Sequence, residues 1–173
     1  MNDTSQGELV ILSLGSNVGD SALILSQAID RLRELAVSPV RFSSVWETTP
    51  VDCPPGSPRF LNAVATFASR TGETPESLLR QLQSIEREFG RQTKVILNEP
   101  RPLDLDLIAF GPARRASPDL ILPHPRATMR QFVLQPLQEL LPDLVLPGQT
   151  QTVTELLGNL EPDPNFRRLS SQG

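Results

Sequence analysis

The order in which two hydrophobic periods follow one another is the feature of this chain that most constrains its fold. A buried apolar run at 8–15, which ends at a glycine, and period-two alternation at 41–48, 60–69 and 103–110 predict four strands. Between the first and second of these runs, and between the third and fourth, apolar residues instead recur with the period of about 3.6 that is typical of an amphipathic helix.

Local signals indicate where the two helices begin and end. Asp20 or Ser21 can cap the first helix, and Thr74 can cap the second, with Pro75 in its first turn and Gly90 after its last. Their buried faces are predicted at Leu25, Ile29, Leu32 and Ala36, and at Leu78, Leu82, Ile85 and Phe89. The order β-α-β-β-α-β indicates an α+β, ferredoxin-like domain with both helices on one face of an antiparallel sheet.

The last predicted strand carries two acids within an apolar run. Leu103, Leu105 and Leu107 share one face of the strand, so Asp104 and Asp106 share the other, roughly 6–7 Å apart. Such a pair can bind one or two divalent cations. Acids on a solvated edge strand are the commoner use of this pattern, and this segment alone does not decide between the two interpretations.

The predicted layout gives each face of the sheet its own set of side chains. The apolar residues that should face the helices are Leu61, Ala63, Ala65 and Phe67 of one strand and Leu103, Leu105 and Leu107 of another. Phe60, Asn62, Asp104 and Asp106 then share the opposite, open face, where an amide and an aromatic ring accompany the acids.

Two long connections flank this face. Residues 49–59 join two strands, and residues 90–102 join the second helix to the aspartate strand. Connections of this length are often binding loops or lids. The second one carries Arg91, Lys94 and Arg101, which could neutralise phosphate charge or could form a surface salt-bridge network.

Other polar residues are less informative. GSNVGD (15–20) lacks the lysine of a phosphate-binding loop, and its glycines indicate a tight turn from strand to helix. His124 is the only histidine, and it could be structural or could bind a phosphate. Gln83 and Glu86 could form an exposed helix face or could orient a nucleotide.

Composition limits the function classes. The chain has 173 residues and one cysteine, Cys53, which predicts one domain over 1–173 without internal disulfides. A net charge of −4 argues against nucleic-acid binding. With no apolar run long enough to span a bilayer and no secretory signal visible, we expect a cytoplasmic monomer. The polar tail from about Glu161 is expected to be loosely held.

Five segments, in order from about residue 9 to about residue 147, resemble one enzyme family. They are GSNVGD (15–20), ETTPV…PRFLNAV (47–64), IEREFGR (85–91), PRPLDLDLIAFG (100–111) and LPHPR…RQFVLQPL (122–137). They are similar to the 6-hydroxymethyl-7,8-dihydropterin pyrophosphokinases of folate synthesis. The resemblance implies a ferredoxin-like fold with additional C-terminal elements, and transfer of the pyrophosphoryl group of ATP to the pterin, giving AMP.

The resemblance also implies roles for individual residues. It assigns two Mg²⁺ ions, which bridge the phosphates of the co-substrate ATP, to Asp104 and Asp106, and stabilisation of the transferring group to Arg91 and Arg101. The implied pterin-binding residues are Thr49, Pro50, Phe60, Asn62 and Phe132. The implied residues around the nucleotide are Leu79, Gln83, Glu86, Lys94, Leu107, His124 and Arg130.

One pair of neighbouring residues departs from the family pattern. Many members have a Trp-Gly pair before Pro100, where this chain has Asn98 and Glu99. The pair belongs to the loop that closes over the substrates, so we expect that loop to close less firmly here.

Two other functions stay open on the residues alone. One is a different two-metal phosphoryl or nucleotidyl transferase that uses the same pair of acids. The other is a non-catalytic ferredoxin-like binding module in which the acids form a solvated face. Formation of AMP from Mg·ATP with and without the pterin separates the three.

Overall fold

The computed structural model describes residues 7–48, 55–56, 58–90 and 102–169. Its elements in chain order are β1 (Leu9–Ser16), α1 (Ser21–Leu35), β2 (Arg41–Phe42), β3 (Trp46–Thr48), β4 (Phe60–Ala68), α2 (Pro75–Glu88), β5 (Asp104–Phe110), β6 (Arg115–Ala116), β7 (Ile121–Leu122), the 3-10 helix η1 (Ala127–Met129), α3 (Gln131–Leu140), α4 (Val153–Gly158) and β8 (Arg167–Arg168).

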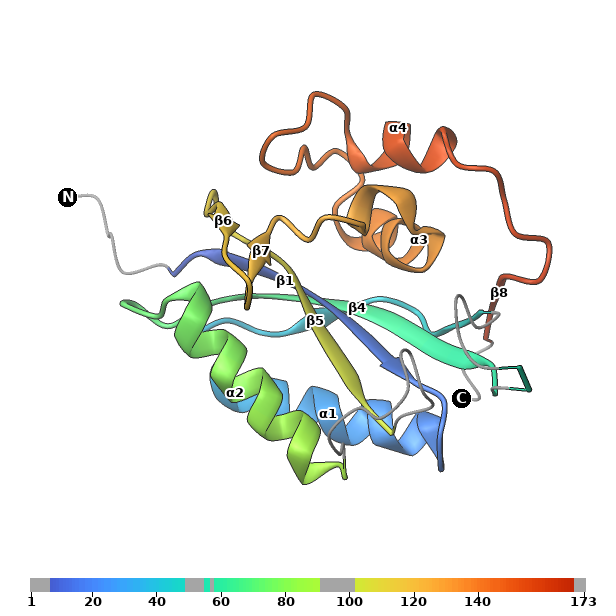
Figure 1. The fold of residues 1–173 in the computed structure, drawn as a ribbon, viewed down its shortest axis with the longest axis horizontal. Helices are drawn as coiled ribbons and strands as arrows, with labels where there is room; N and C mark the ends of the chain where they lie inside the picture. Colours follow the sequence, from blue (N-terminus) through green and yellow to red (C-terminus); the bar gives the residue numbers. More distant parts are fainter. Residues whose placement is uncertain (1–6, 49–54, 57, 91–101, 170–173) are drawn as a thin grey trace.

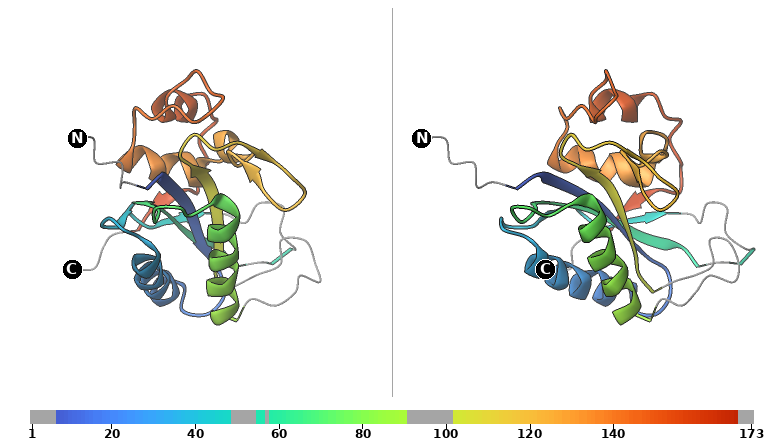
Figure 2. Two further views of the ribbon diagram at one scale, coloured as in Figure 1. Left: turned by 90° about the vertical axis from the view of Figure 1, so that its left-hand side faces the viewer. Right: turned by 60° about the vertical axis from the view of Figure 1, so that its left-hand side comes forward.

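The central sheet has the strand order β5-β1-β4-β3-β8, with β2 also paired to β4. Every pairing in it is antiparallel. β2 and β3 both pair with β4 and count as one interrupted strand, so the segment from β1 to β5 runs β-α-β-β-α-β and the fold predicted from the sequence is confirmed. Helices α1 and α2 lie together on one face of the sheet, while α3 and α4 lie on the other (Figures 1 and 2).

The core between the sheet and the first two helices is built from the predicted apolar faces. Leu103, Leu105 and Leu107 are each at most 4% exposed, and they pack in one cluster with Leu82 and Ile85 of α2. The same cluster includes Leu25, Ala28 and Leu32 of α1 and Ala65 and Phe67 of β4. Because the leucines of β5 are committed to this core, the alternation of the strand turns its two acids to the opposite face.

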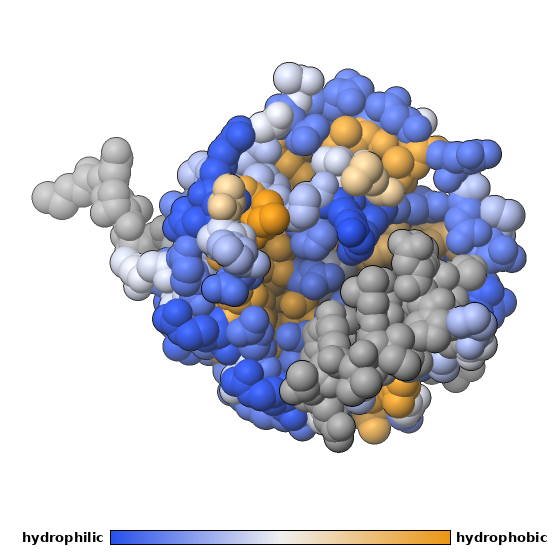
Figure 3. Space-filling model, in the orientation of Figure 1, coloured by the Kyte–Doolittle hydropathy of each residue, from blue (hydrophilic) through white to orange (hydrophobic). Residues whose placement is uncertain are grey.

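The opposite face is only partly open, which corrects the expectation of an uncovered valley. Ile11, Val64 and Ile108 on the sheet form a second core with α3 and α4. The helix residues in this core are Val133, Leu134, Leu137, Val153 and Leu156. In the space-filling view, hydrophobic residues gather at α3 and α4 and also below β6 and β7, with hydrophilic residues around both areas (Figure 3). Asp104 and Asp106, which precede Ile108 in β5, are not part of this second core.

The strand predicted over 41–48 is broken into β2 and β3 at a serine. The Ser43 backbone N–H donates to the Val64 carbonyl at 2.9 Å, but the Val64 N–H donates to the Ser43 side-chain Oγ, also at 2.9 Å. The hydroxyl thus replaces the backbone acceptor of a regular ladder, as serine side chains do when they compete with secondary structure.

The end signals of the second helix are confirmed. The Thr74 side chain accepts a hydrogen bond from the Ser77 N–H, and the Ser77 side chain accepts one from the Thr74 N–H. Pro75 occupies the first turn. Gly90 follows with a φ of 89°, a conformation that glycine adopts without strain. No helix among the described residues is both long and apolar enough to cross a bilayer.

The tail differs from its expectation. Although residues beyond Glu161 were expected to be loosely held, β8 pairs with β3, and Phe166 stacks on Trp46. The sequence pattern gave no sign of this, because a two-residue strand has no readable period.

We expect Ser43→Ala to lower the free energy of unfolding by about 1–3 kcal/mol, because it leaves the buried Val64 N–H without its acceptor. Ser44→Ala is the matched control, since Ser44 contacts Glu139 through its backbone N–H. Urea denaturation of both variants measures the difference. Equal stabilities would show that the Ser43 hydroxyl contributes nothing to the ladder.

Candidate functional site

The strand register brings the predicted pterin residue Asn62 and the predicted metal residue Asp104 to either side of one glycine. Gly15 in β1 pairs with Asn62 of β4 on one side and with Asp104 of β5 on the other. Directly paired residues share a face, and neighbouring strands lie about 4.8 Å apart, so the two side chains leave the same face about 10 Å apart.

Gly15 is needed for space and not for a turn, which corrects its sequence interpretation. It lies inside β1, and a Cβ placed on it would come within 3.0 Å of Asn62 Oδ1 and 3.6 Å of the Phe60 ring. Gly19, with a φ of 81°, is the glycine of the turn. The absence of a side chain at Gly15 lets the Asn62 amide and the Phe60 ring lie close against β1.

The amide of Asn62 is fixed in orientation. Its Nδ2 donates to Thr48 Oγ1 at 2.7 Å, and both residues are about 5% exposed. This bond turns Oδ1 toward Gly15. Thr48 was not predicted as a site residue; its register with Phe60 at the end of β4 was the only available signal, and that signal requires the strand pairing to be known.

Asp104 and Asp106 are both partly exposed on the polar face of β5. They pair with Gly15 and Ser13 of β1, so they stand on the same side of the strand as predicted. Two carboxylates fit Mg²⁺, which proteins commonly bind through one or two carboxylates while phosphates and water supply its other ligands. The described residues contain no group of three or more His, Cys, Asp or Glu side chains that could hold a metal.

Glu86 of α2 forms a hydrogen bond with the backbone of the strand that carries the two acids. It is 7% exposed, and its Oε2 accepts the N–H of Leu105, the residue between the two acids, at 3.2 Å. The sequence left open whether Glu86 forms an exposed helix face, and the burial excludes that alternative. Its hydrogen bond instead fixes the backbone that carries both carboxylates.

His124 reaches the same end of the site through a bulge in β5. Leu107 pairs with Leu12 and Ala109 with Ile11, which leaves Ile108 as the extra residue. The Ile108 carbonyl accepts the His124 N–H at 2.8 Å. The bulge therefore attaches the histidine to the acidic strand.

The surroundings of His124 keep its imidazole neutral. Burial, together with the positive charges of Arg130 and Arg126, lowers its pKa from 6.5 to about 4, and the negative charge of Asp104 only partly opposes this shift. Its Nδ1 accepts the N–H of Arg126 at 3.2 Å, so Nε2 carries the proton and can donate to an oxygen. His124, Arg130 and Asp104 thus lie within electrostatic reach of one another.

Arg130 and Phe132, which the resemblance assigns to different substrates, contact each other. The Arg130 guanidinium lies over the Phe132 ring, 5.2 Å from its centroid, at the start of α3. Such stacking restricts a flexible cation to one region.

The remaining predicted nucleotide residues differ in accessibility. Gln83 is exposed on α2. Leu79 is half-buried against the core between the sheet and helices α1 and α2, which we call the helix-side core. Leu107 is 4% exposed within that core, so its side chain is not presented to a ligand. The predicted residues Thr49, Pro50, Arg91, Lys94 and Arg101, together with the divergent Asn98 and Glu99, lie outside the described residues.

Comparison with known proteins agrees with this geometry. The family model for 7,8-dihydro-6-hydroxymethylpterin-pyrophosphokinase (HPPK) matches residues 11–142. A 2-amino-4-hydroxy-6-hydroxymethyldihydropteridine pyrophosphokinase of Methylorubrum extorquens is 38% identical over 157 residues, which are 87% of this chain and 92% of that protein. A folate synthesis bifunctional protein of Arabidopsis thaliana is 39% identical over 139 residues, which are 80% of this chain but only 28% of that protein.

A solved structure shows the same fold. Wild-type HPPK-DHPS of Plasmodium falciparum matches with a TM-score of 0.72 and 14% sequence identity, over 96% of this chain and 49% of that one. The family model and the bacterial relative extend this likeness from the fold to the sequence. This chain belongs to the 7,8-dihydro-6-hydroxymethylpterin-pyrophosphokinase family.

Proposed function

We propose that this protein transfers the pyrophosphoryl group of ATP to 6-hydroxymethyl-7,8-dihydropterin, giving the pterin diphosphate and AMP, in folate biosynthesis. The observation that carries the proposal is the arrangement around Gly15. A fixed amide lies on one side of it and a pair of carboxylates on the other. The names of the relatives support this substrate pair.

The Asn62 side suits the pterin. A pterin ring presents a row of donors and acceptors, and the buried, oriented amide of Asn62 can satisfy part of that row. Phe60 and Phe132 offer aromatic surface for the faces of the ring. A ring held there would direct its hydroxymethyl group past Gly15 toward the acids on the neighbouring strand.

The Asp104 side suits the triphosphate. Asp104 and Asp106 would hold two Mg²⁺ ions, which when bound neutralise charge on the phosphate oxygens. Neutral His124 can donate from Nε2 to a phosphate oxygen, and Arg130 adds a positive charge. The resemblance assigns Arg91, Lys94 and Arg101 to the same group of phosphate-binding cations.

In the proposed reaction, the hydroxymethyl oxygen bonds to the β-phosphorus. The bond between that phosphorus and the α,β-bridging oxygen breaks, the bridging oxygen leaves with AMP, and the hydroxyl proton passes to solvent. The residues contribute mainly by positioning and by neutralising charge. We also propose that the protein acts as a cytoplasmic monomer, as expected from its sequence.

The direct test is incubation of the purified protein with Mg·ATP, with and without 6-hydroxymethyl-7,8-dihydropterin. Pterin-dependent formation of AMP and of the pterin diphosphate, identified by mass, supports the proposal. Formation of AMP without pterin would favour another phosphoryl or nucleotidyl transferase. No turnover and no pterin binding would favour the non-catalytic binding module.

Asp104→Asn and Asp106→Asn should each lower turnover by at least about 100-fold, because each removes a charge from the site where phosphate charge is neutralised. The fold should persist, since neither side chain contributes to the helix-side core. Asp119→Asn, at an exposed acid, is the control. Initial rates of AMP formation and thermal melts measure the effect; near-normal rates in both variants would remove the acids from the mechanism.

Gly15→Ala should weaken pterin binding by about 5- to 150-fold while leaving ATP binding within about 2-fold. The added methyl meets Asn62 Oδ1 at 3.0 Å and must displace the amide or the ligand. Gly158→Ala, whose Cβ would meet nothing within 4 Å, is the matched control. Titration calorimetry with each ligand decides: an equal loss of both affinities would place Gly15 outside the pterin pocket.

The single histidine makes its ionisation directly observable. Without Mg²⁺ or nucleotide, the imidazole NMR signals should titrate with a pKa of about 4. Because this lies below the unfolded value of 6.5, the stability that His124 contributes is complete above pH 6.5 and falls as the pH drops toward 4. His124→Gln should lack that part of the fall in urea denaturation. A midpoint near 6.5 would mean that His124 is solvated.

A further inference from the structure

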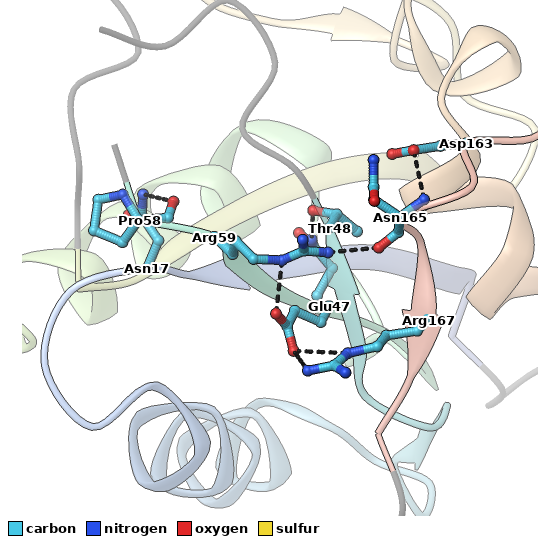
Figure 4. Close-up of polar contacts among 9 residues, drawn as sticks. Asn17, Glu47, Thr48, Pro58, Arg59, Asp163, Asn165 and Arg167 are labelled. Atoms are coloured by element: carbon cyan, nitrogen blue, oxygen red, sulfur yellow. Dashed lines mark hydrogen bonds and ion pairs between the residues drawn. The ribbon is translucent and has the colours of Figure 1, made fainter. Parts of the chain in front are cut away.

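A carboxylate in β3 joins three segments that are distant in the sequence. Glu47 is 17% exposed, and its Oε1 lies 2.6 Å from Arg59 Nε, while its Oε2 accepts from Arg167 Nη2 at 2.8 Å and from Arg167 Nε at 3.2 Å (Figure 4). Arg59 directly precedes β4, and Arg167 belongs to β8 near the end of the chain. One side chain thus receives both an arginine beside the site and an arginine from the C-terminal segment.

The C-terminal segment, residues 163–169, is held against the edge of the sheet at several further points, and we refer to it as the C-terminal strap. Phe166 stacks on Trp46 with ring centroids 4.9 Å apart. The Leu169 N–H donates to the Val45 carbonyl at 2.9 Å. At its other end, the Asp163 N–H donates to Gln131 Oε1 at 2.9 Å, which ties the strap to the first residue of α3.

The strap contacts the residues that neighbour the pterin half of the site. Trp46, on which Phe166 stacks, is the direct cross-strand partner of Asn62. Glu47 directly precedes Thr48, which binds the Asn62 amide. Arg59 directly precedes Phe60, and its Nη2 donates to the Asn165 carbonyl of the strap. Trp46, Glu47 and Arg59 are therefore each held by a strap contact.

The energetics of these contacts favour a positioning role over a stabilising one. The Arg59 and Arg167 side chains are 40% and 69% exposed, and exposed ion pairs contribute only about 0–1 kcal/mol each to stability. A carboxylate shared by two guanidinium groups nevertheless sets the direction in which both strands enter the site. Loss of the pair should move the strand ends more than it unfolds the protein.

We propose that the C-terminal strap is a positioning element for pterin binding and that Glu47 is the residue through which it acts. The inference rests on the proposed function, because the ligand is the pterin. Glu47 does not touch the ligand; it orients the Thr48–Asn62 pair and Phe60 through the backbone of β3 and the start of β4.

Glu47→Gln and Arg167→Gln should each weaken 6-hydroxymethyl-7,8-dihydropterin binding by at least about 5-fold. ATP affinity and kcat at saturating pterin should stay within about 2-fold. Because Arg167 acts through Glu47, the double variant should resemble Glu47→Gln, and the losses should not add. Arg167→Lys, which keeps the charge, should recover part of the affinity.

The control is Arg33→Gln, which removes an exposed arginine from an ion pair within α1. Pterin and ATP affinities are measured by calorimetry on the full chain, with kcat and KM from AMP formation and a thermal melt for each variant. Unchanged pterin affinity in a folded Arg167→Gln protein, equal losses for both ligands, or additive losses in the double variant would each overturn the inference.

Failure of the proposed function is distinguishable from failure of this inference. If the unaltered protein neither binds the pterin nor forms AMP with it, the proposed function fails. If it does both and Arg167→Gln behaves like Arg33→Gln, only the positioning role of the strap is wrong.

Discussion

The pairing of β1 with two strands at once is the constraint on which the site depends. β1 lies between β4 and β5, and its register decides which residues of those strands meet at Gly15. A slip of one residue would turn Asn62 or the acids into the helix-side core, where their burial would be unfavourable. The leucines of β5, buried on that side, oppose such a slip. The hydrophobic core therefore fixes the site through the register.

The pterin half and the phosphate half of the site differ in how far the protein positions its binding groups before a substrate is bound. Asn62 and Thr48 are buried and bound to each other, so the amide is oriented before any ligand arrives. Asp104 and Asp106 are partly exposed, and two carboxylates supply only a fraction of the ligands that Mg²⁺ takes. In the proposed function, the pterin half recognises a rigid ring and the phosphate half is completed by its substrate.

The sequence predicted the features that repeat with a local period. The order of elements and the opposite faces of Leu105 and Asp104 follow from the period of a strand or helix. The helix ends at Thr74 and Gly90 follow from residue types that cap helices. The break at Ser43, the burial of Glu86 and the strap were not predictable in this way. Each depends on a partner that is distant in the sequence and leaves no local pattern. The resemblance named the pterin residues but not Thr48, which orients the Asn62 amide, or Gly15, which leaves room for it.

The bond from Leu105 to Glu86 has a consequence beyond the site. Among the described residues, β5 forms one edge of the sheet, and an unpaired edge can recruit a strand from another molecule and begin aggregation. The Leu105 N–H that such a strand would need is already bound to a buried carboxylate of α2. A strand that must keep two acids accessible at the margin of the sheet is thereby kept from pairing with its neighbours in solution.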